Sequence, residues 1–291
     1  MKIFTKLNSF LILTGIVISS LTIKAQDKLL TKEELGKKIT YFKMGAALHE
    51  AQEVYIFDLS NNKLLDLPEG IGKLSKIQIF ILNGNNLSAL IPETEKLVNL
   101  QKINLMMNQF TSFPVLLCKL TNLKEVYLDQ NQITSFPPEI ENLQNLHTIS
   151  ISGNLIEKLP PQIGKLVNLS DLIMPYNKLI ALPAEIGELI KLNRLILREN
   201  KLVALPAEIG KLSELTELIL SKNQISSITP EIGKLSNLKK LDLSGNKLTT
   251  LPSEIGNLTG LEKLNLAGNL IPSEEQQKIT KLLPNCIVKF E

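Results

Sequence analysis

Ten asparagines that recur at a constant spacing of 23 residues constrain this chain more than any other feature. Each stands in the same frame of apolar residues, and residues 238–260 read LKKLDLSGNKLTTLPSEIGNLTG. A fixed period of this length predicts a solenoid, in which similar coils stack and each contacts only its neighbours. The ten asparagines are Asn62, Asn85, Asn108, Asn131, Asn154, Asn177, Asn200, Asn223, Asn246 and Asn269.

Each place in the repeat has a physical role when the first apolar residue is counted as place one. In the repeat that starts at Leu238, the segment Leu241-Asp242-Leu243 alternates between inward and outward side chains, which predicts a short strand. Stacked beside its copies, this strand joins a long parallel sheet. The asparagine at place nine follows where the chain turns inward, and its amide can both donate and accept hydrogen bonds there. We therefore expect an asparagine ladder along the spine.

The second half of most repeats reads P-x-E-I-G-x-L. Proline suits the entry to a turn or a short helical segment, so we expect irregular or 3₁₀-like segments on the convex side. The glycines are expected to allow a tight or positive-φ turn. These glycines are Gly164, Gly187, Gly210, Gly233 and Gly256.

The combined motif, LPxEIGxLxNLxxLxLxxNxL, resembles the 23-residue leucine-rich repeats of the Ras-suppressor and plant intracellular Ras-group type. Bacterial and disease-resistance-type proteins share this motif. The resemblance covers residues 54 to about 283 and implies an α/β solenoid, a horseshoe with a parallel concave sheet. It implies little about function, because such repeats bind many unrelated partners.

Residues 1–25 have the form of a secretory signal peptide. Lys2 and Lys6 precede an apolar run at residues 10–23, and Ala25 stands before Gln26. The alternative is an uncut membrane anchor, although the run is short for a full span. We expect export to the periplasm or the medium, with a cytoplasmic location as the alternative.

The remaining chain divides into two caps and the repeats. Residues 26–53 carry a capping-box pair, Thr31 with Glu34, and predict one or two helices that cover the first repeat. Residues 54–272 hold the ten repeats. Residues 273–291 predict a helix and a final strand at residues 286–290, so we expect no kinase, hydrolase or membrane tail after the repeats.

Composition excludes several functions. The net charge of +3 disappears once the three lysines of the leader are removed, so no polybasic footprint points to nucleic acid or to anionic lipid. Two histidines, two cysteines and no catalytic or phosphate-binding motif argue against an enzyme, a metal site or a cofactor. The absence of tryptophan and an aromatic content of 4% disfavour a carbohydrate-binding module.

The variable outward places of the strands form a concave face about 45–50 Å long, given about 4.8 Å per strand. We expect Ile173, Ile196 and Ile219 to make an exposed apolar stripe at place five, although strand propensity alone could explain them. The only two arginines, Arg194 and Arg198, flank Ile196 on the same face. Interfaces favour arginine and tyrosine, so the expected partner-binding residues are Ile173, Tyr176, Arg194, Ile196, Arg198, Ile219 and Tyr127.

Two reservations apply to this surface. Asp171 and Glu217 stand beside Arg194 in the neighbouring repeats, and an internal ion ladder could occupy it. A second, weaker cluster lies toward the N-terminal end and consists of Ile79, Ile81, Met106, Met107 and Tyr127.

The fold class and the concave face together lead to two hypotheses about function. The leading hypothesis is an exported, non-enzymatic module that binds a protein or peptide on the concave sheet. The alternative is an intracellular signalling scaffold, as the resemblance implies. The sequence leaves the identity of the partner and the oligomeric state open.

Overall fold

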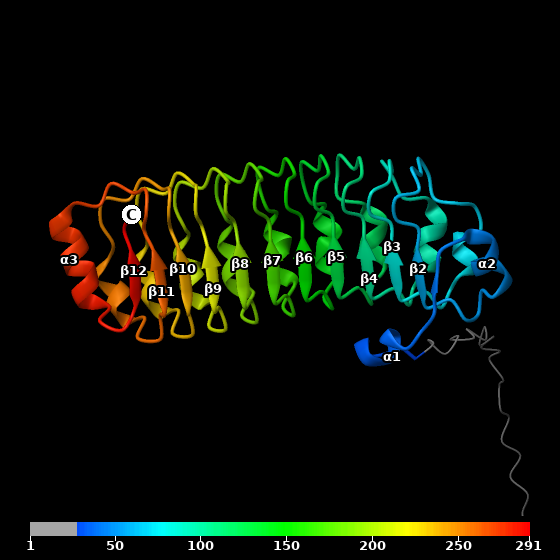
Figure 1. Cartoon of the computed structure of the whole chain (residues 1–291), viewed down its shortest axis with the longest axis horizontal. Coiled ribbons are helices and arrows are strands. Elements are labelled where there is room, and N and C mark those ends of the chain that lie inside the picture. The colour runs from blue at the N-terminus through cyan, green and yellow to red at the C-terminus, as the bar shows by residue number, and fades with distance from the viewer. Residues whose placement is uncertain (1–27) are drawn as a thin grey trace, which may run out of the picture.

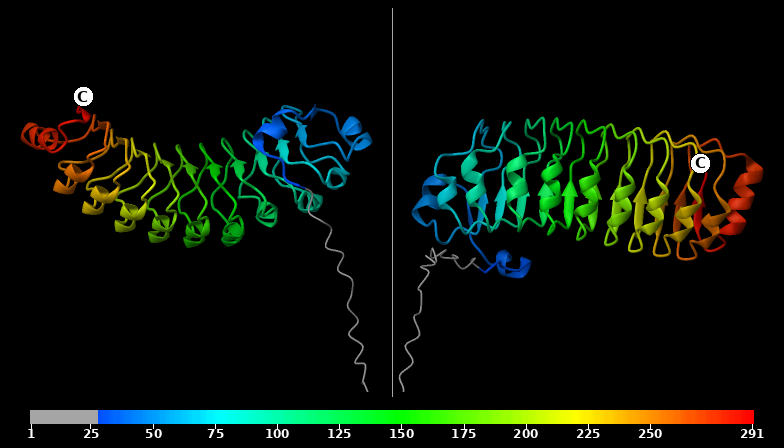
Figure 2. Two further views of the ribbon diagram at one scale, coloured as in Figure 1. Left: turned by 90° about the horizontal axis from the view of Figure 1, so that it is seen from below. Right: turned by 180° about the vertical axis from the view of Figure 1, so that it is seen from behind.

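The computed structural model describes residues 28–291, so the predicted leader at residues 1–25 lies outside the described residues. Twelve parallel strands form one open sheet in strict sequence order. Leu218 of one repeat stands opposite Leu241 of the next, which is the 23-residue offset of the sequence. The strands line the inner side of an arc and the 3₁₀ segments form its outer side (Figures 1 and 2). The predicted solenoid is therefore confirmed.

The strands are β1 (Thr40–Tyr41), β2 (Ile56–Asp58), β3 (Ile79–Ile81), β4 (Lys102–Asn104), β5 (Glu125–Tyr127), β6 (Thr148–Ser150), β7 (Asp171–Ile173), β8 (Arg194–Ile196), β9 (Glu217–Ile219), β10 (Lys240–Asp242), β11 (Lys263–Asn265) and β12 (Ile287–Lys289). The 3₁₀ segments are η1 (Ile71–Lys73), η2 (Pro92–Lys96), η3 (Val115–Lys119), η4 (Pro138–Asn142), η5 (Pro161–Lys165), η6 (Ala184–Glu188), η7 (Ala207–Lys211), η8 (Pro230–Lys234) and η9 (Ser253–Asn257). The α-helices are α1 (Lys32–Gly36), α2 (Met44–His49) and α3 (Ser273–Leu282).

One continuous apolar core runs the length of the solenoid. Each strand contributes its central residue, such as Leu172 of β7, while the residues on either side point to the concave face. Toward the N-terminal end, Phe57 and Phe80 stack with ring centroids 5.7 Å apart. Because every repeat buries its leucines against the next, no repeat has a core of its own.

The place-nine asparagines bond each turn to the turn of the repeat before it. The side-chain oxygen of Asn177 accepts from the N–H of Ile156 at 3.1 Å. Its amide nitrogen donates to the carbonyls of Ile151 at 2.9 Å and Met174 at 3.2 Å. The same pattern recurs at the other buried members, which are Asn85, Asn108, Asn131, Asn154, Asn200, Asn223 and Asn246.

The two end members of the series differ from the rest. Asn269 keeps its bonds to Leu248, Leu243 and Leu266 but is only half-buried. Asn62 is exposed, and its amide donates to the carbonyl of Ser60 in its own turn. The expectation of ten equivalent asparagines is wrong for Asn62, because no repeat precedes it to supply the turn that it would bond.

The convex glycines serve close packing and not the positive φ that the sequence suggested. None of Gly164, Gly187 and Gly210 has a positive φ. A Cβ added to Gly187 would lie 2.5 Å from the carbonyl oxygen of Glu208 in the next repeat. Atoms cannot approach so closely, so only glycine lets the 3₁₀ segments of adjacent repeats stack at this distance.

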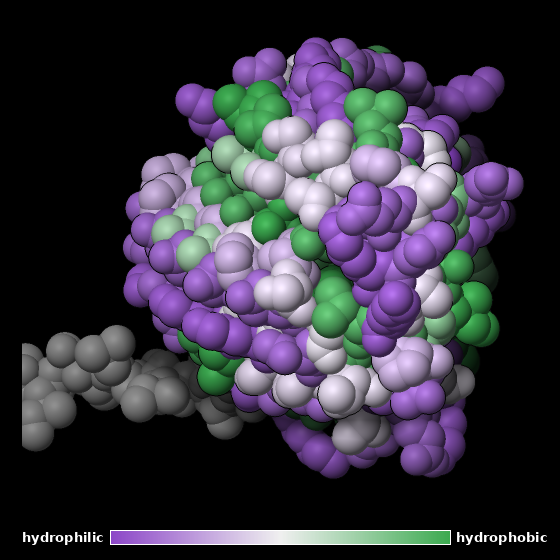
Figure 3. Space-filling model, turned by 90° about the vertical axis from the view of Figure 1, so that its left-hand side faces the viewer, coloured by the Kyte–Doolittle hydropathy of each residue, from purple (hydrophilic) through white to green (hydrophobic). Residues whose placement is uncertain are grey.

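The ends of the solenoid are covered differently. Ala47 of α2 is fully buried, and Leu48 lies beside Gly70, so α2 covers the first repeat. At the other end, α3 buries Ile279, and β12 forms the last strand. The C-terminal end face mixes hydrophilic and hydrophobic side chains (Figure 3).

Helix α1 does not share the covering role that the sequence suggested for it. It lies below β4 in Figure 1, beside the starts of the strands. Two side chains of the solenoid, Gln78 and Gln101, bond the backbone just ahead of α1 and hold it away from the end.

The asparagine ladder makes a stability prediction. Asn177→Ala would leave the buried N–H of Ile156 without a partner, while the carbonyls of Ile151 and Met174 would keep their second bonds from Asn154 and Asn200. We therefore expect it to lower the free energy of unfolding by about 2 kcal/mol. Asn62→Ala is the matched control at the same place of the repeat, and it should change stability by less than about 0.5 kcal/mol. Urea denaturation followed by circular dichroism measures both, and equal losses would contradict a special role for the buried amide.

Candidate interaction surface

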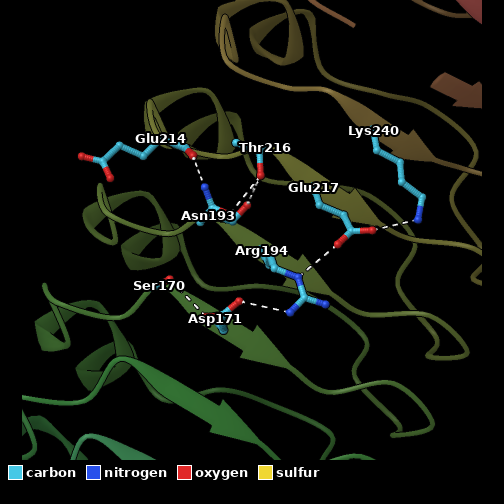
Figure 4. Close-up of polar contacts among 8 residues, drawn as sticks. All are labelled: Ser170, Asp171, Asn193, Arg194, Glu214, Thr216, Glu217 and Lys240. Atoms are coloured by element: carbon cyan, nitrogen blue, oxygen red, sulfur yellow. Dashed lines mark hydrogen bonds and ion pairs between the residues drawn. The ribbon is translucent and has the colours of Figure 1, made fainter. Parts of the chain in front are cut away.

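A row of charges crosses the concave face at place three. Arg194 donates to Asp171 at 3.4 Å on one side and to Glu217 at 3.1 Å on the other (Figure 4). Glu217 also accepts from Lys240 at 2.8 Å. The row therefore runs from β7 to β10 with alternating sign, and Arg194 has its charge matched within the chain.

The carboxylate of Glu217 interacts with two cationic side chains, those of Arg194 and Lys240. Partial burial alone would raise its pKa, but the hydrogen bonds and charges of Lys240 and Arg194 outweigh burial and hold the pKa below its ordinary value. Glu217 is therefore ionised at neutral pH and belongs to the row of charges rather than to a free acidic site.

Tyr127 lies in a similar internal cluster. Its hydroxyl donates to Glu125 at 3.0 Å, and Glu125 also pairs with Lys102 at 2.9 Å. The Lys102 ammonium lies 4.8 Å from the centroid of the Tyr127 ring. Burial, followed by the charge of Glu125, raises the pKa of Tyr127 to about 12. Most of the bonding capacity of this tyrosine is used inside the chain.

The isoleucine stripe is less exposed than its sequence suggested. Ile173 and Ile196 are half-buried, but Ile219 is only 7% exposed. Ile196 and Asp242 stand in register on either side of Ile219, at the close spacing of adjacent strands. The prediction of three exposed isoleucines is wrong for Ile219, because neighbours on a concave sheet cover one another.

Place eight forms an exposed rim at the ends of the strands, in the left-handed backbone conformation throughout. Glycine fills the place in four repeats, and Tyr176 fills it with a φ of +57°. This conformation costs a residue with a side chain about 1–2 kcal/mol. Sequence reasoning missed this feature, although the recurring glycines before the asparagine were its signal.

Tyr176 is the large aromatic side chain of this rim. It is 47% exposed, and the guanidinium of Arg198 lies 5.5 Å from its ring centroid. Arg198 donates to Glu199 at 3.1 Å, and Lys222 pairs with the same carboxylate at 2.8 Å. Tyr176 and Arg198 thus form an exposed cation–π pair beside Ile173 and Ile196.

The weaker N-terminal cluster is not a single open surface. Met107 at place eight is 46% exposed. Ile79, in contrast, borders a cleft together with Leu35 of α1, which lies over this part of the sheet. The structure therefore separates Met107, on the place-eight rim, from Ile79, which borders the cleft beside α1.

Reactive groups are few in residues 28–291. Both cysteines are free, and burial raises the pKa of Cys118 to about 12, which keeps its thiol protonated and unreactive. No three potential metal ligands gather in this part of the chain. It also holds no membrane-spanning helix, since none of its helices combines the needed length with enough apolar character.

The row of charges predicts how stability depends on pH. Because the folded-state pKa of Glu217 is depressed, its contribution is present above its ordinary pKa of about 4.3 and is lost as the pH falls through the lower folded value. We expect Glu217→Gln to lower the melting temperature at neutral pH and to have little effect at about pH 2–3. Thermal melts from pH 7 downward test this, with the exposed Glu141→Gln as control. A difference that persists undiminished at low pH would contradict the ionic origin.

Known proteins share this repeat architecture. A family model described as a leucine-rich repeat region matches residues 116–197 and 182–285. No curated protein was found to match the sequence. Leucine-rich repeat regions are interaction modules, and the expectation that the chain is not an enzyme is confirmed by this family.

Solved structures give the same assignment. The plant peptide hormone receptor RGFR1 in complex with RGF2 is 35% identical, with a TM-score of 0.63, over 74% of this chain and 36% of that chain. The PEPR1–AtPEP1 structure is 28% identical, with a TM-score of 0.69, over 87% of this chain and 36% of that chain. This chain thus spans little more than a third of the length of either of these chains.

An internalin, inlF of Listeria monocytogenes, shares the fold at 22% identity, with a TM-score of 0.63, over 89% of this chain and 82% of that chain. The family model covers more than half of the sequence, and the repeats stack as described above. The chain belongs to the leucine-rich repeat family.

Proposed function

We propose that this chain is an exported binding module whose concave face and adjoining rim hold a protein or peptide partner. Two of the similar structures are complexes, RGFR1 with RGF2 and PEPR1 with AtPEP1, which supports a binding role for a solenoid of this kind. A sheet held by a continuous core is preformed, so binding costs little ordering of the chain.

The exposed pair of Tyr176 and Arg198 carries the proposal. Tyr176 occupies a left-handed position that glycine would fill without strain, so the fold itself gives no reason for an aromatic residue there. Tyrosine and arginine are frequent anchors of interfaces. Ile173 and Ile196 supply an apolar surface directly beside them.

The other proposed contact residues have smaller parts. Arg194 and Tyr127 are held in internal clusters and present fixed charge and shape to a partner. Ile219 contributes little surface and supports Ile196 from its side. We place the centre of the partner site on repeats six and seven for this reason.

The repeat subtype belongs to the same proposal. We infer that these are 23-residue repeats of the class that resembles the Ras-suppressor and plant intracellular Ras-group type. The motif with its proline and convex glycine supports this assignment, and so do the 3₁₀ segments that replace longer convex helices.

The partner surface is tested with peptides selected against the chain from a random library displayed on phage. Arg198→Glu and Tyr176→Gly should each weaken the selected peptides about 30-fold, the effect of losing an anchor worth about 2 kcal/mol. Lys211→Glu on the convex η7 makes the same change of charge as Arg198→Glu and should leave the affinity unchanged. Isothermal titration calorimetry provides the measurement.

Tyr176→Gly also separates binding from folding. Glycine suits the left-handed backbone, so this variant should unfold at nearly the wild-type temperature. If the selected peptides bind Arg198→Glu and Tyr176→Gly as tightly as they bind the wild type and the Lys211→Glu control, the proposed surface is excluded.

Export is the second component of the proposal, and it rests on the form of residues 1–25. We expect the protein recovered outside the cytoplasm of its native cells to begin near Gln26, which N-terminal sequencing would detect. A chain that starts at Met1 and stays in the cytosol would favour the intracellular scaffold instead.

A further inference from the structure

The segment of residues 28–36, here called the strap, contacts repeats of the solenoid that lie far from it in the sequence. It runs along the edge where the strands start and ends in α1 (Figures 1 and 2). The rim that carries Tyr176 follows the other ends of the strands. Thr31 and Glu34 form a complete capping box at the start of α1, with each side chain accepting from the other residue's backbone N–H. The capping box thus fixes where the helix of the strap begins.

Two glutamines of the solenoid bond the strap through its backbone alone. The side-chain oxygen of Gln78 accepts from the N–H of Leu30 at 2.8 Å, and its amide nitrogen donates to the carbonyl of Lys28 at 3.4 Å. Gln101 donates to the carbonyl of Leu30 at 2.9 Å and to the oxygen of Gln78 at 2.7 Å. The pair therefore recognises an extended main chain and does not depend on its side chains.

Burial sets these glutamines apart from their equivalents. Both stand at place two, where Gln78 is fully buried and Gln101 is 5% exposed. In the other repeats of residues 28–291, place two is exposed or half-buried, as at Lys124, His147 and Lys239. Two adjacent repeats thus carry linked amides that gain their remaining partners only when a peptide lies across them.

A leucine of the strap anchors it a few residues later. Leu35 is 6% exposed and borders an open cleft of about 160 Å³ between α1 and the sheet. Ile79, Lys102 and Glu125 line the other side of this cleft. The strap does not fill the cleft, and a side chain larger than leucine has room there.

We infer that Gln78, Gln101 and this cleft form a peptide-binding site that the chain fills with its own strap. Its ligand is a peptide with a short extended stretch, a capped helical turn and a large apolar residue at the position of Leu35. A separate peptide of this kind competes with the strap, which holds the site by few contacts and by its tether. This site lies apart from Tyr176 and Arg198, although Lys102 and Glu125 of its cleft also contact Tyr127, and it can be tested without the other partner.

The experiment uses the full chain with its strap released by Leu30→Pro and Leu35→Asp together. Proline removes the N–H that Gln78 accepts, and aspartate is unsuited to the apolar cleft. The probe is a fluorescent synthetic peptide of residues 28–38, followed by anisotropy. We expect it to bind the released chain at least about tenfold more tightly than the wild type, where the tethered strap competes at an effective concentration in the millimolar range.

Further variants test the parts of the site within the released chain. Gln78→Leu keeps the side-chain size but removes the backbone recognition, and it should abolish binding. Lys239→Leu at the same place of the ninth repeat should leave binding intact. A probe with phenylalanine in place of Leu35 should bind several-fold more tightly, because it uses the open volume of the cleft.

Two results would overturn the inference. One is an equal affinity of the probe for the released chain with and without Gln78→Leu. The other is no binding to the released chain at about 1 mM probe, the concentration that a short tether supplies. Hydrogen exchange in the wild type provides a second measurement. The Leu30 amide should exchange slowly although it precedes α1, and Gln78→Leu should abolish this protection.

Discussion

The structure depends on how the buried turns of the solenoid satisfy their backbone hydrogen bonds. Each coil turns inward at place nine, where water cannot reach the main chain, and an unpaired N–H or C=O there would cost more than most side chains contribute. The amide of Asn177 meets one donor and two acceptors at once, in its own repeat and in the one before. Asparagine has the reach and the two kinds of atom that this geometry requires. The ladder thereby fixes the register of every coil and leaves only the outward places free to vary.

Sequence alone predicts the features that repeat and misses those that arise between repeats. The strands, the convex 3₁₀ segments and the inward turns follow from one coil and its period. The burial of Ile219 does not, because it depends on Ile196 and Asp242 in the adjacent strands. The role of Gly187 is also set by its neighbour, since the carbonyl of Glu208 approaches it from the next coil. A single repeat carries no information on these distances.

The candidate surface shows the same division. The sequence shows which residue types form this surface, but it does not show which of them are free to contact a partner. Arg194 and Tyr127 are held by charged residues at place three, while Tyr176 lies on the exposed rim with Arg198 against its ring. Where a residue breaks the local preference of its backbone without a gain in packing, function is the natural explanation.

The two edges of the sheet differ in what they can recognise, and the solenoid geometry is the reason. At the ends of the strands, the left-handed turn projects side chains such as Tyr176 outward, where they can contact the surface of a partner. At the starts of the strands, the side chains of Gln78 and Gln101 at place two are hydrogen-bonded to each other across adjacent repeats. This pair bonds the N–H of Leu30 and the carbonyls of Lys28 and Leu30, which are main-chain groups. The two proposed sites would therefore recognise different features, side chains on one edge and main chain on the other, and each edge can vary without disturbing the asparagine ladder.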